Sequence, residues 1–175
     1  DYLSRKKSKL KVLVLETQEG RWNAFFNGRC DLMSSDTTDL RAGILMLAPN
    51  IDDYIIFPNV ISKEPLAPAV RNDDDQWFDI VKWVINTTIA AEEYGVNSTN
   101  ISEIPLDMPL QAVRLFNNDN LLGGALGLDK DWAIRVIKDV GNYGEIFQRN
   151  LGQGSRFKFE RGLNNLWTQG GLMYA

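Results

Sequence analysis

The pattern of hydrophobic and polar positions in the first third of the chain alternates between short apolar runs and helical spacing. Apolar runs rich in Val, Leu and Ile predict buried strands at residues 9–15, 30–34 and 54–57. Between these runs, Trp22, Phe25 and Phe26 recur at helical spacing, and residues 39–47 are predicted to form a second helix. Because strands that alternate with helices are typical of parallel βαβ units, the fold class predicted is α/β.

Capping residues mark the ends of both predicted helices. Thr17 precedes the first helix, and Gly28 follows it at a position that favours a left-handed residue. Thr37 or Thr38 is expected to cap the second helix, which Pro49 stops.

Residues 61–71 differ from the segments before them. This stretch holds two prolines and is predicted to be an extended strand that crosses between domains, so we place a domain boundary there. The rest of the chain is predicted to be mainly helical. The expected helices are residues 77–94 up to Gly95, one capped by Asp107, one capped by Asp129, residues 142–150, and residues 161–167.

Composition narrows the classes of function. A net charge of −4 without a long basic face disfavours a nucleic-acid partner, because phosphate neutralisation dominates that binding. The chain has no histidine, the commonest general base and metal ligand, and we predict neither an enzyme nor a metal or cofactor site. No apolar run reaches the roughly 18 residues that span a bilayer. The single cysteine, Cys30, is either a buried apolar side chain or half of a disulfide whose partner is missing.

Asp36 is the main candidate for ligand binding. It follows the predicted strand 30–34 and precedes a helix, and ligands of open α/β sheets bind at the carboxyl ends of strands. Its carboxylate can pair with an ammonium group, and neighbouring hydroxyls can add hydrogen bonds, namely those of Ser34, Ser35, Thr37 and Thr38. The alternative is an ordinary helix cap, which position alone favours, although this stretch offers more polar groups than a cap needs.

Four stretches resemble the general L-amino-acid-binding proteins of bacterial ABC uptake systems. The family's segment with a ligand aspartate resembles NGRCDLMSSDTTDL at 27–40. Its second hinge strand and following helix are similar to ISKEPLAPAVRNDDDQWFDIVKW at 61–83. Its closing region resembles GLDKDWAIRVIKDVGNYGEIFQRNLG at 127–152 and RGLNNLWTQGGLMYA at 161–175, almost motif for motif. The resemblance covers most of residues 9–175.

The resemblance implies a type II periplasmic binding fold, in which two α/β lobes joined by two crossing strands close on a ligand. On that template, residues 1–64 are the later part of the second lobe. Residues 65–175 are the mostly helical part of the first lobe that the chain forms on its return. The hinge is expected at Ser62, Lys63, Glu64 and Pro65. In the family, an aspartate at the position of Asp36 holds the ligand's α-ammonium, and Arg or another polar residue usually stands at the position of Thr37.

The resemblance also implies that the chain is N-terminally truncated, and its start lacks the regions of a signal peptide. In the family, the preceding segment supplies most of the first lobe's sheet and the arginine that clamps the ligand's α-carboxylate. It also supplies a cysteine that pairs with the one matching Cys30, as expected of an exported periplasmic protein. An incomplete second lobe leaves strand edges exposed, which favours strand pairing or dimerisation.

Three hypotheses about function follow. The first is a periplasmic receptor, not an enzyme, that captures L-amino acids between two lobes and delivers them to the membrane subunits of an ABC permease. The second is an interaction module that binds no ligand and acts through its helical C-terminal half. The third is a dehydratase-like enzyme on the same fold. This sequence has no histidine and no convincing acid–base pair, which disfavours the third hypothesis.

Overall fold

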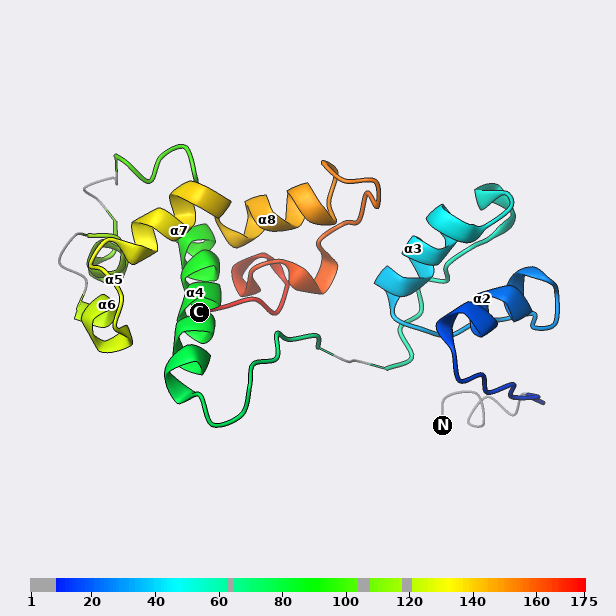
Figure 1. The fold of residues 1–175 in the computed structure, drawn as a ribbon. Coiled ribbons are helices and arrows are strands. Elements are labelled where there is room, and N and C mark those ends of the chain that lie inside the picture. The colour runs from blue at the N-terminus through cyan, green and yellow to red at the C-terminus, as the bar shows by residue number, and fades with distance from the viewer. Residues whose placement is uncertain (1–8, 63–64, 104–107, 118–120) are drawn as a thin grey trace. The chain divides into compact units, whose positions relative to one another are not determined.

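Figure 1 shows the chain as a computed structural model. The structure describes residues 9–62, 65–103, 108–117 and 121–175. The chain forms two compact units, Asp1–Ala67 and Pro68–Ala175. No helix within the described ranges is long and apolar enough to cross a membrane.

In its described residues, the first unit is built on a pair of helices. Its helical elements are α2 (Gln18–Phe26), α3 (Thr37–Leu47) and the short 3-10 helix η1 (Ile51–Asp53). Thr17 is the N-cap of α2, and its hydroxyl accepts a hydrogen bond from the Gly20 amide at 3.1 Å. Gly28 follows α2 with a φ of 69°, a conformation that favours glycine. The predicted helix and both of its end signals are therefore confirmed.

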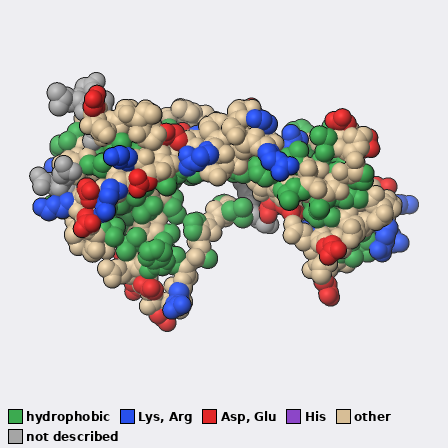
Figure 2. Space-filling model, turned by 45° about the horizontal axis from the view of Figure 1, so that its top comes forward, with side chains coloured by type: hydrophobic (Ala, Val, Ile, Leu, Met, Phe, Trp, Pro, Cys, Tyr) green, Lys and Arg blue, Asp and Glu red, His purple; other side chains and the backbone are tan. Residues whose placement is uncertain are grey.

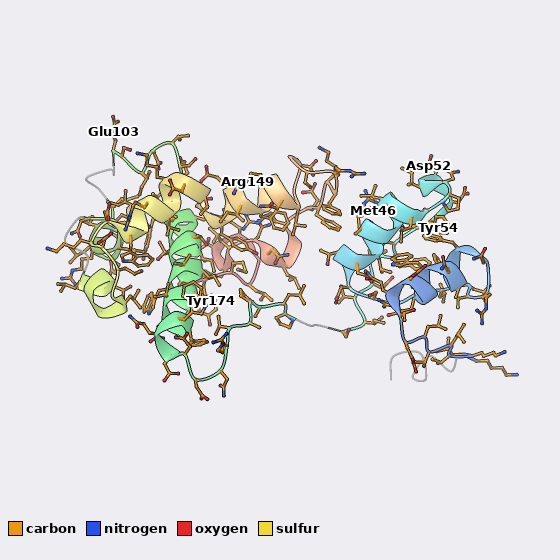
Figure 3. All side chains as sticks on the ribbon, in the orientation of Figure 1. Met46, Asp52, Tyr54, Glu103, Arg149 and Tyr174 are labelled. Carbon is orange, nitrogen blue, oxygen red and sulfur yellow. The ribbon has the colours of Figure 1, made fainter. Side chains whose placement is uncertain are left out.

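Aromatic side chains form the core of the first unit. Trp22 is buried and stacks on Phe26, with 5.3 Å between the ring centroids. Tyr54, which is labelled in Figure 3, packs its ring against Phe25 and Phe26 at 5.5 and 5.1 Å. Gly43 of α3 is also buried and lies directly against the Trp22 ring. The close approach of α2 and α3 therefore depends on the absence of a side chain at residue 43.

Replacing Gly43 with alanine is expected to destabilise the first unit by about 1–3 kcal/mol, the usual cost of overpacking. An added Cβ would lie 1.8 Å from Cζ2 of Trp22, so the ring or α3 must move. Urea unfolding followed by Trp fluorescence would measure the loss. The matched control is Gly124→Ala, where nothing lies within 4 Å of the added Cβ. Equal stability of Gly43→Ala and the wild type would contradict the packing described here.

The predicted strands are not formed, and this is a correction to the sequence analysis. Residues 9–15, 30–34 and 54–57 have no strand, and the described part of residues 61–71 has none either. A strand requires backbone hydrogen bonds to a neighbouring strand, and within the described residues no backbone hydrogen bond joins these segments to another. The α/β class is thus not visible as a sheet, and the expected pairing through strand edges stays a prediction.

Apolar side chains of these segments are correspondingly exposed. Val14 is 83% exposed and Ile55 is 76% exposed, although both belong to runs whose composition suits a buried strand. Figure 2 shows hydrophobic side chains gathered in patches on the surface of both units.

The second unit is organised around one long helix, α4 (Asp75–Glu93). Four shorter helices all contact it, namely α5 (Leu110–Leu115), α6 (Leu121–Leu126), α7 (Trp132–Val140) and α8 (Tyr143–Asn150). Two 3-10 helices follow, η2 (Gly162–Asn164) and η3 (Trp167–Gln169). In Figure 1, α7 and α8 run one after the other across the end of α4. Gly95 follows α4 with a φ of 68°, so its predicted role at the helix end is confirmed.

The core of the second unit lies between α4 and the shorter helices. Phe116, Val96 and Ile137 are at most 1% exposed and pack together with Trp132. Each fully buried apolar side chain of this size contributes about 1.5–3 kcal/mol. This cluster therefore accounts for a separate folded body in residues 68–175.

One cap and one helix predicted for the second unit are wrong. Asp129 does not cap α7, which begins at Trp132, and its carboxylate instead accepts a hydrogen bond from Arg135 at 2.9 Å. Residues 161–167 do not form one helix, because the carbonyls of Asn164 and Asn165 accept hydrogen bonds from Arg161 and Met173. The predicted cap Asp107 lies outside the described residues.

A capping box starts α8, and the predicted helix at residues 142–150 is confirmed. The Asn142 side chain accepts a hydrogen bond from the Glu145 amide, and the Glu145 carboxylate accepts one from the Asn142 amide at 2.8 Å. The same carboxylate accepts hydrogen bonds from the Ser98 amide and hydroxyl at 3.0 and 2.6 Å. Burial by itself raises the pKa of Glu145, but these hydrogen bonds and the nearby Arg149 outweigh it, and the net pKa is lowered.

The lowered pKa of Glu145 predicts an acid-sensitive contribution to stability. Because the pKa of the folded carboxyl lies below its ordinary value of 4.5, its contribution is present above pH 4.5 and is lost as the pH falls through the folded pKa. The difference in unfolding free energy between wild type and Glu145→Gln should therefore shrink below pH 4.5. Urea titrations across this range would measure it, with the exposed Glu103→Gln as control. A difference that stays constant with pH would contradict the prediction.

Candidate functional site

Asp36 stands immediately before α3, at its N-cap position. Its carbonyl accepts the first helical hydrogen bond, from the Leu40 amide at 2.9 Å, but its side chain makes no capping hydrogen bond. The residue is exposed. The carboxylate is therefore not engaged by the first amides of α3, and it is available to a cation from solution.

The four hydroxyls around Asp36 have different surroundings. Ser34 and Thr37 are exposed, whereas Ser35 and Thr38 are half-buried. Thr37 and Thr38 are the first two residues of α3, so the prediction that one of them is its N-cap is wrong. The helix begins at Thr37, two residues earlier than the predicted start at Asp39, and the Asp36 carbonyl accepts its first helical hydrogen bond.

Asp39 organises the polar contacts of this region. Its Oδ1 accepts a hydrogen bond from Nε2 of Gln18 at 2.7 Å, and its Oδ2 accepts one from the Ser35 hydroxyl at 2.6 Å. Arg21 places Nη2 at 3.8 Å from the same Oδ2 and Nη1 at 3.5 Å from Ser35 Oγ. We call Gln18, Arg21, Ser35 and Asp39 the Asp39 network. The sequence analysis did not single out Asp39, although its four-residue spacing from Ser35 was a usable signal.

An open groove of about 480 Å³ lies between α2 and α3. Its walls combine apolar side chains, Trp22, Phe26 and Met46, with the polar Gln18 and Asp39. None of the five candidate residues between Ser34 and Thr38 lines it. This groove and the exposed Asp36 carboxylate are thus separate features of the first unit.

The remaining candidates give little geometry. Within the described ranges, no group of three or more His, Cys, Asp or Glu side chains is placed to hold a metal ion. Cys30 is a free, half-buried thiol, and its predicted pairing with a cysteine of another segment stays a prediction. Of the predicted hinge, Ser62 and Pro65 are exposed and lie outside any helix or strand, and Lys63 and Glu64 lie outside the described residues.

Comparison with known proteins identifies the relatives of this chain. It is 46% identical over 178 residues to the general L-amino acid-binding periplasmic protein AapJ of Rhizobium johnstonii. That alignment covers all of this chain and 52% of AapJ. It is 42% identical over 165 residues to the glutamate/glutamine/aspartate/asparagine-binding protein BztA of Rhodobacter capsulatus. That alignment covers 94% of this chain and 48% of BztA. No protein-family model matches the chain.

A solved structure agrees with these relatives. This chain matches an ABC-transporter periplasmic binding protein of Brucella ovis with glutathione bound, at a TM-score of 0.86 and 41% identity. The match covers 99% of this chain and 54% of the Brucella chain. Over its whole length, the chain is similar to amino-acid-binding proteins of ABC transporters. It spans about half the length of the curated relatives that it matches.

The match to the solved structure supports the periplasmic binding fold that the sequence resemblance implied. The described helices are those of a periplasmic binding protein, although the structure forms no sheet within the described residues. The relatives are named as binding and transport proteins, not as enzymes. The site itself, Asp36 with its neighbouring hydroxyls, carries no assignment from the comparisons.

Proposed function

We propose that the protein is a periplasmic receptor, not an enzyme, that captures an L-amino acid between two lobes and delivers it to an ABC permease. The observation that carries this proposal is a similarity along the whole chain to proteins named for binding amino acids. Closure is proposed to be a hinge motion at residues 62–65.

The chemistry of Asp36 supports the ligand class. An exposed carboxylate without a capping hydrogen bond can form a charge-assisted hydrogen bond to an ammonium group. Ser34 and Thr37 are exposed on either side of it and can supply further hydroxyl contacts. We therefore assign Asp36 the α-ammonium group of the ligand. Ser35 and Thr38 are half-buried, so we give them supporting roles around this carboxylate.

The ligands named for two relatives share one chemical feature. BztA is named for glutamate, glutamine, aspartate and asparagine, and the Brucella protein holds glutathione. The γ-glutamyl end of glutathione carries a free α-ammonium and α-carboxylate, as each of those amino acids does. Recognition through this shared end is compatible with several side chains. We propose that the present protein likewise binds the α-amino-acid group of its ligand.

The test is isothermal calorimetry on the protein as its gene encodes it. The panel consists of L-glutamine, L-glutamate, L-asparagine, glutathione, D-glutamine and glutaramate, which is L-glutamine without the α-ammonium group. Binding of one or more L-amino acids or of glutathione is expected, with much weaker binding of D-glutamine and glutaramate. Absence of binding to every member of the panel would overturn the proposal, and so would equal affinity for L-glutamine and glutaramate.

A further inference from the structure

We propose that Asp39 is a positioning residue for ligand capture, because it occupies Arg21 and Ser35 and so keeps the Asp36 carboxylate free for the ligand's ammonium. This inference rests on the proposed function, since it deepens the role of Asp36 in that site. Its basis is the Asp39 network, which joins α2 to the residue directly before Asp36.

Both oxygens of the Asp39 carboxylate are engaged within this network. Gln18 donates to Oδ1 at 2.7 Å, while the Ser35 hydroxyl at 2.6 Å and the Arg21 guanidinium at 3.8 Å meet Oδ2. The side chains of Arg21 and Asp39 are 35% and 20% exposed, so solvent screens their attraction only in part. Asp39 is also in the first turn of α3, where a negative charge is favourable.

Loss of the Asp39 charge would make the Arg21 guanidinium a competitor of the ligand's ammonium for the Asp36 carboxylate. The Arg21 guanidinium already reaches Ser35 Oγ at 3.5 Å, and Ser35 is the neighbour of Asp36 in the chain. If Asp39 loses its charge, Arg21 keeps this position without its carboxylate partner. The carboxylate next to Ser35 in the chain is Asp36, the group assigned to the ligand. A guanidinium binds a carboxylate well, so it would compete with the ligand's ammonium.

Asp39 also orients the turn in which Asp36 lies. The Ser35 hydroxyl donates to Asp39 across the start of α3, so the residue before Asp36 is fixed to the helix after it. Asp36 itself keeps an extended backbone, with φ −58° and ψ 144°. A binding group held in this way loses less conformational freedom when it meets a ligand.

The experiment is calorimetry with L-glutamine on the protein as its gene encodes it, with circular-dichroism melting of each variant. Asp39→Asn is expected to weaken binding roughly tenfold, within the usual range for coupled neighbours. Asp39→Glu retains the charge and is expected to keep most of the affinity. Arg21→Gln combined with Asp39→Asn removes the competing cation, so the double variant should bind more tightly than Asp39→Asn alone. A merely structural role would make the double variant bind no better.

Two controls separate this inference from folding and from the proposed function. Asp129→Asn breaks the exposed ion pair with Arg135 and should leave affinity unchanged. If Asp39→Asn does not fold, Gln18→Ala takes its place. It is a milder change in the Asp39 network and should weaken binding roughly twofold. Loss of binding in Asp36→Asn together with wild-type affinity in Asp39→Asn overturns this inference alone. Wild-type protein that binds no α-amino-acid ligand overturns both proposals.

Discussion

Replacing Asp36 with asparagine is expected to weaken the binding of L-glutamine by roughly 100-fold in the protein as its gene encodes it. The substitution keeps the shape of the side chain and removes the negative charge that we assign to the ligand's ammonium. Removing one partner of a desolvated charge pair typically costs about 2–5 kcal/mol. Because the Asp36 side chain caps no helix amide, the change should leave the melting temperature nearly unaltered.

Calorimetric titration of wild type and Asp36→Asn measures this effect. The matched control is Asp52→Asn, an exposed carboxylate of the same unit that is labelled in Figure 3. That control should bind like the wild type. Unchanged affinity in Asp36→Asn would remove Asp36 from the site, and equal losses in both variants would point to a general effect of charge.

Replacing Arg161 with alanine is expected to destabilise the second unit by about 3 kcal/mol, the lower end of the cost of breaking a buried ion pair. Arg161 donates to both oxygens of Glu92, at 2.7 and 3.1 Å, and the two side chains are only 11% and 14% exposed. Its guanidinium carbon also lies 5.3 Å from the ring centroids of Tyr143 and Phe147. Burial raises the pKa of the Tyr143 phenol, although the charge of Arg161 opposes this.

The contacts of Arg161 join segments far apart in the chain. Glu92 belongs to α4, Tyr143 and Phe147 belong to α8, and Arg161 precedes η2. Loss of the side chain leaves a poorly solvated Glu92 carboxylate without its partner. The second unit should therefore melt more than about 10 °C lower, on the usual relation between free energy and melting temperature.

Circular-dichroism melting of Arg161→Ala tests this second prediction. The control is Arg135→Ala, which breaks ion pairs with Asp129 and Asp131. The side chains of these pairs are 49–78% exposed, so the change in stability should be less than about 1 kcal/mol. Similar melting temperatures for the two variants would show that the buried pair contributes no more than the surface pair. The 161–175 segment would then be held by its other contacts, among them the hydrogen bond from Trp167 Nε1 to Glu93 at 2.8 Å.

Helices with clear caps were predictable from the sequence, and the reason is local. Thr17 and Gly28 delimit α2, and Asn142 with Glu145 begins α8, because each signal acts within a few residues of the end that it defines. α6 gave no such signal, since Gly123 and Gly124 lower helix propensity. Gly123 is instead explained by packing, because an added Cβ would lie 2.9 Å from Cδ1 of Trp132.

Strands were not predictable in the same way, because a strand depends on a neighbour. The run at residues 9–15 has the composition of a buried strand, yet Val12 and Val14 are 69% and 83% exposed. Composition indicates whether the side chains of a segment suit a buried strand. The strand itself forms only when its backbone hydrogen-bonds to a neighbouring strand. Within the described residues, no backbone hydrogen bond joins residues 9–15 to another segment, so the run has no neighbouring strand there.

The candidate site was predictable in part. Asp36 and its hydroxyl neighbours were found from their place after an apolar run and before a helix. The contacts of Asp39 were not predicted because they involve Gln18 and Arg21, which come from α2 and approach α3 only in the folded unit. Contacts between helices are set by packing, and spacing within one segment does not reveal them.

A crystal structure of the gene-encoded protein with bound L-glutamine tests the central claim most directly. The account predicts that a carboxylate oxygen of Asp36 lies within hydrogen-bond distance of the ligand's α-ammonium nitrogen, at about 2.7–3.2 Å. L-Glutamine bound elsewhere, with the Asp36 carboxylate facing solvent, would contradict it.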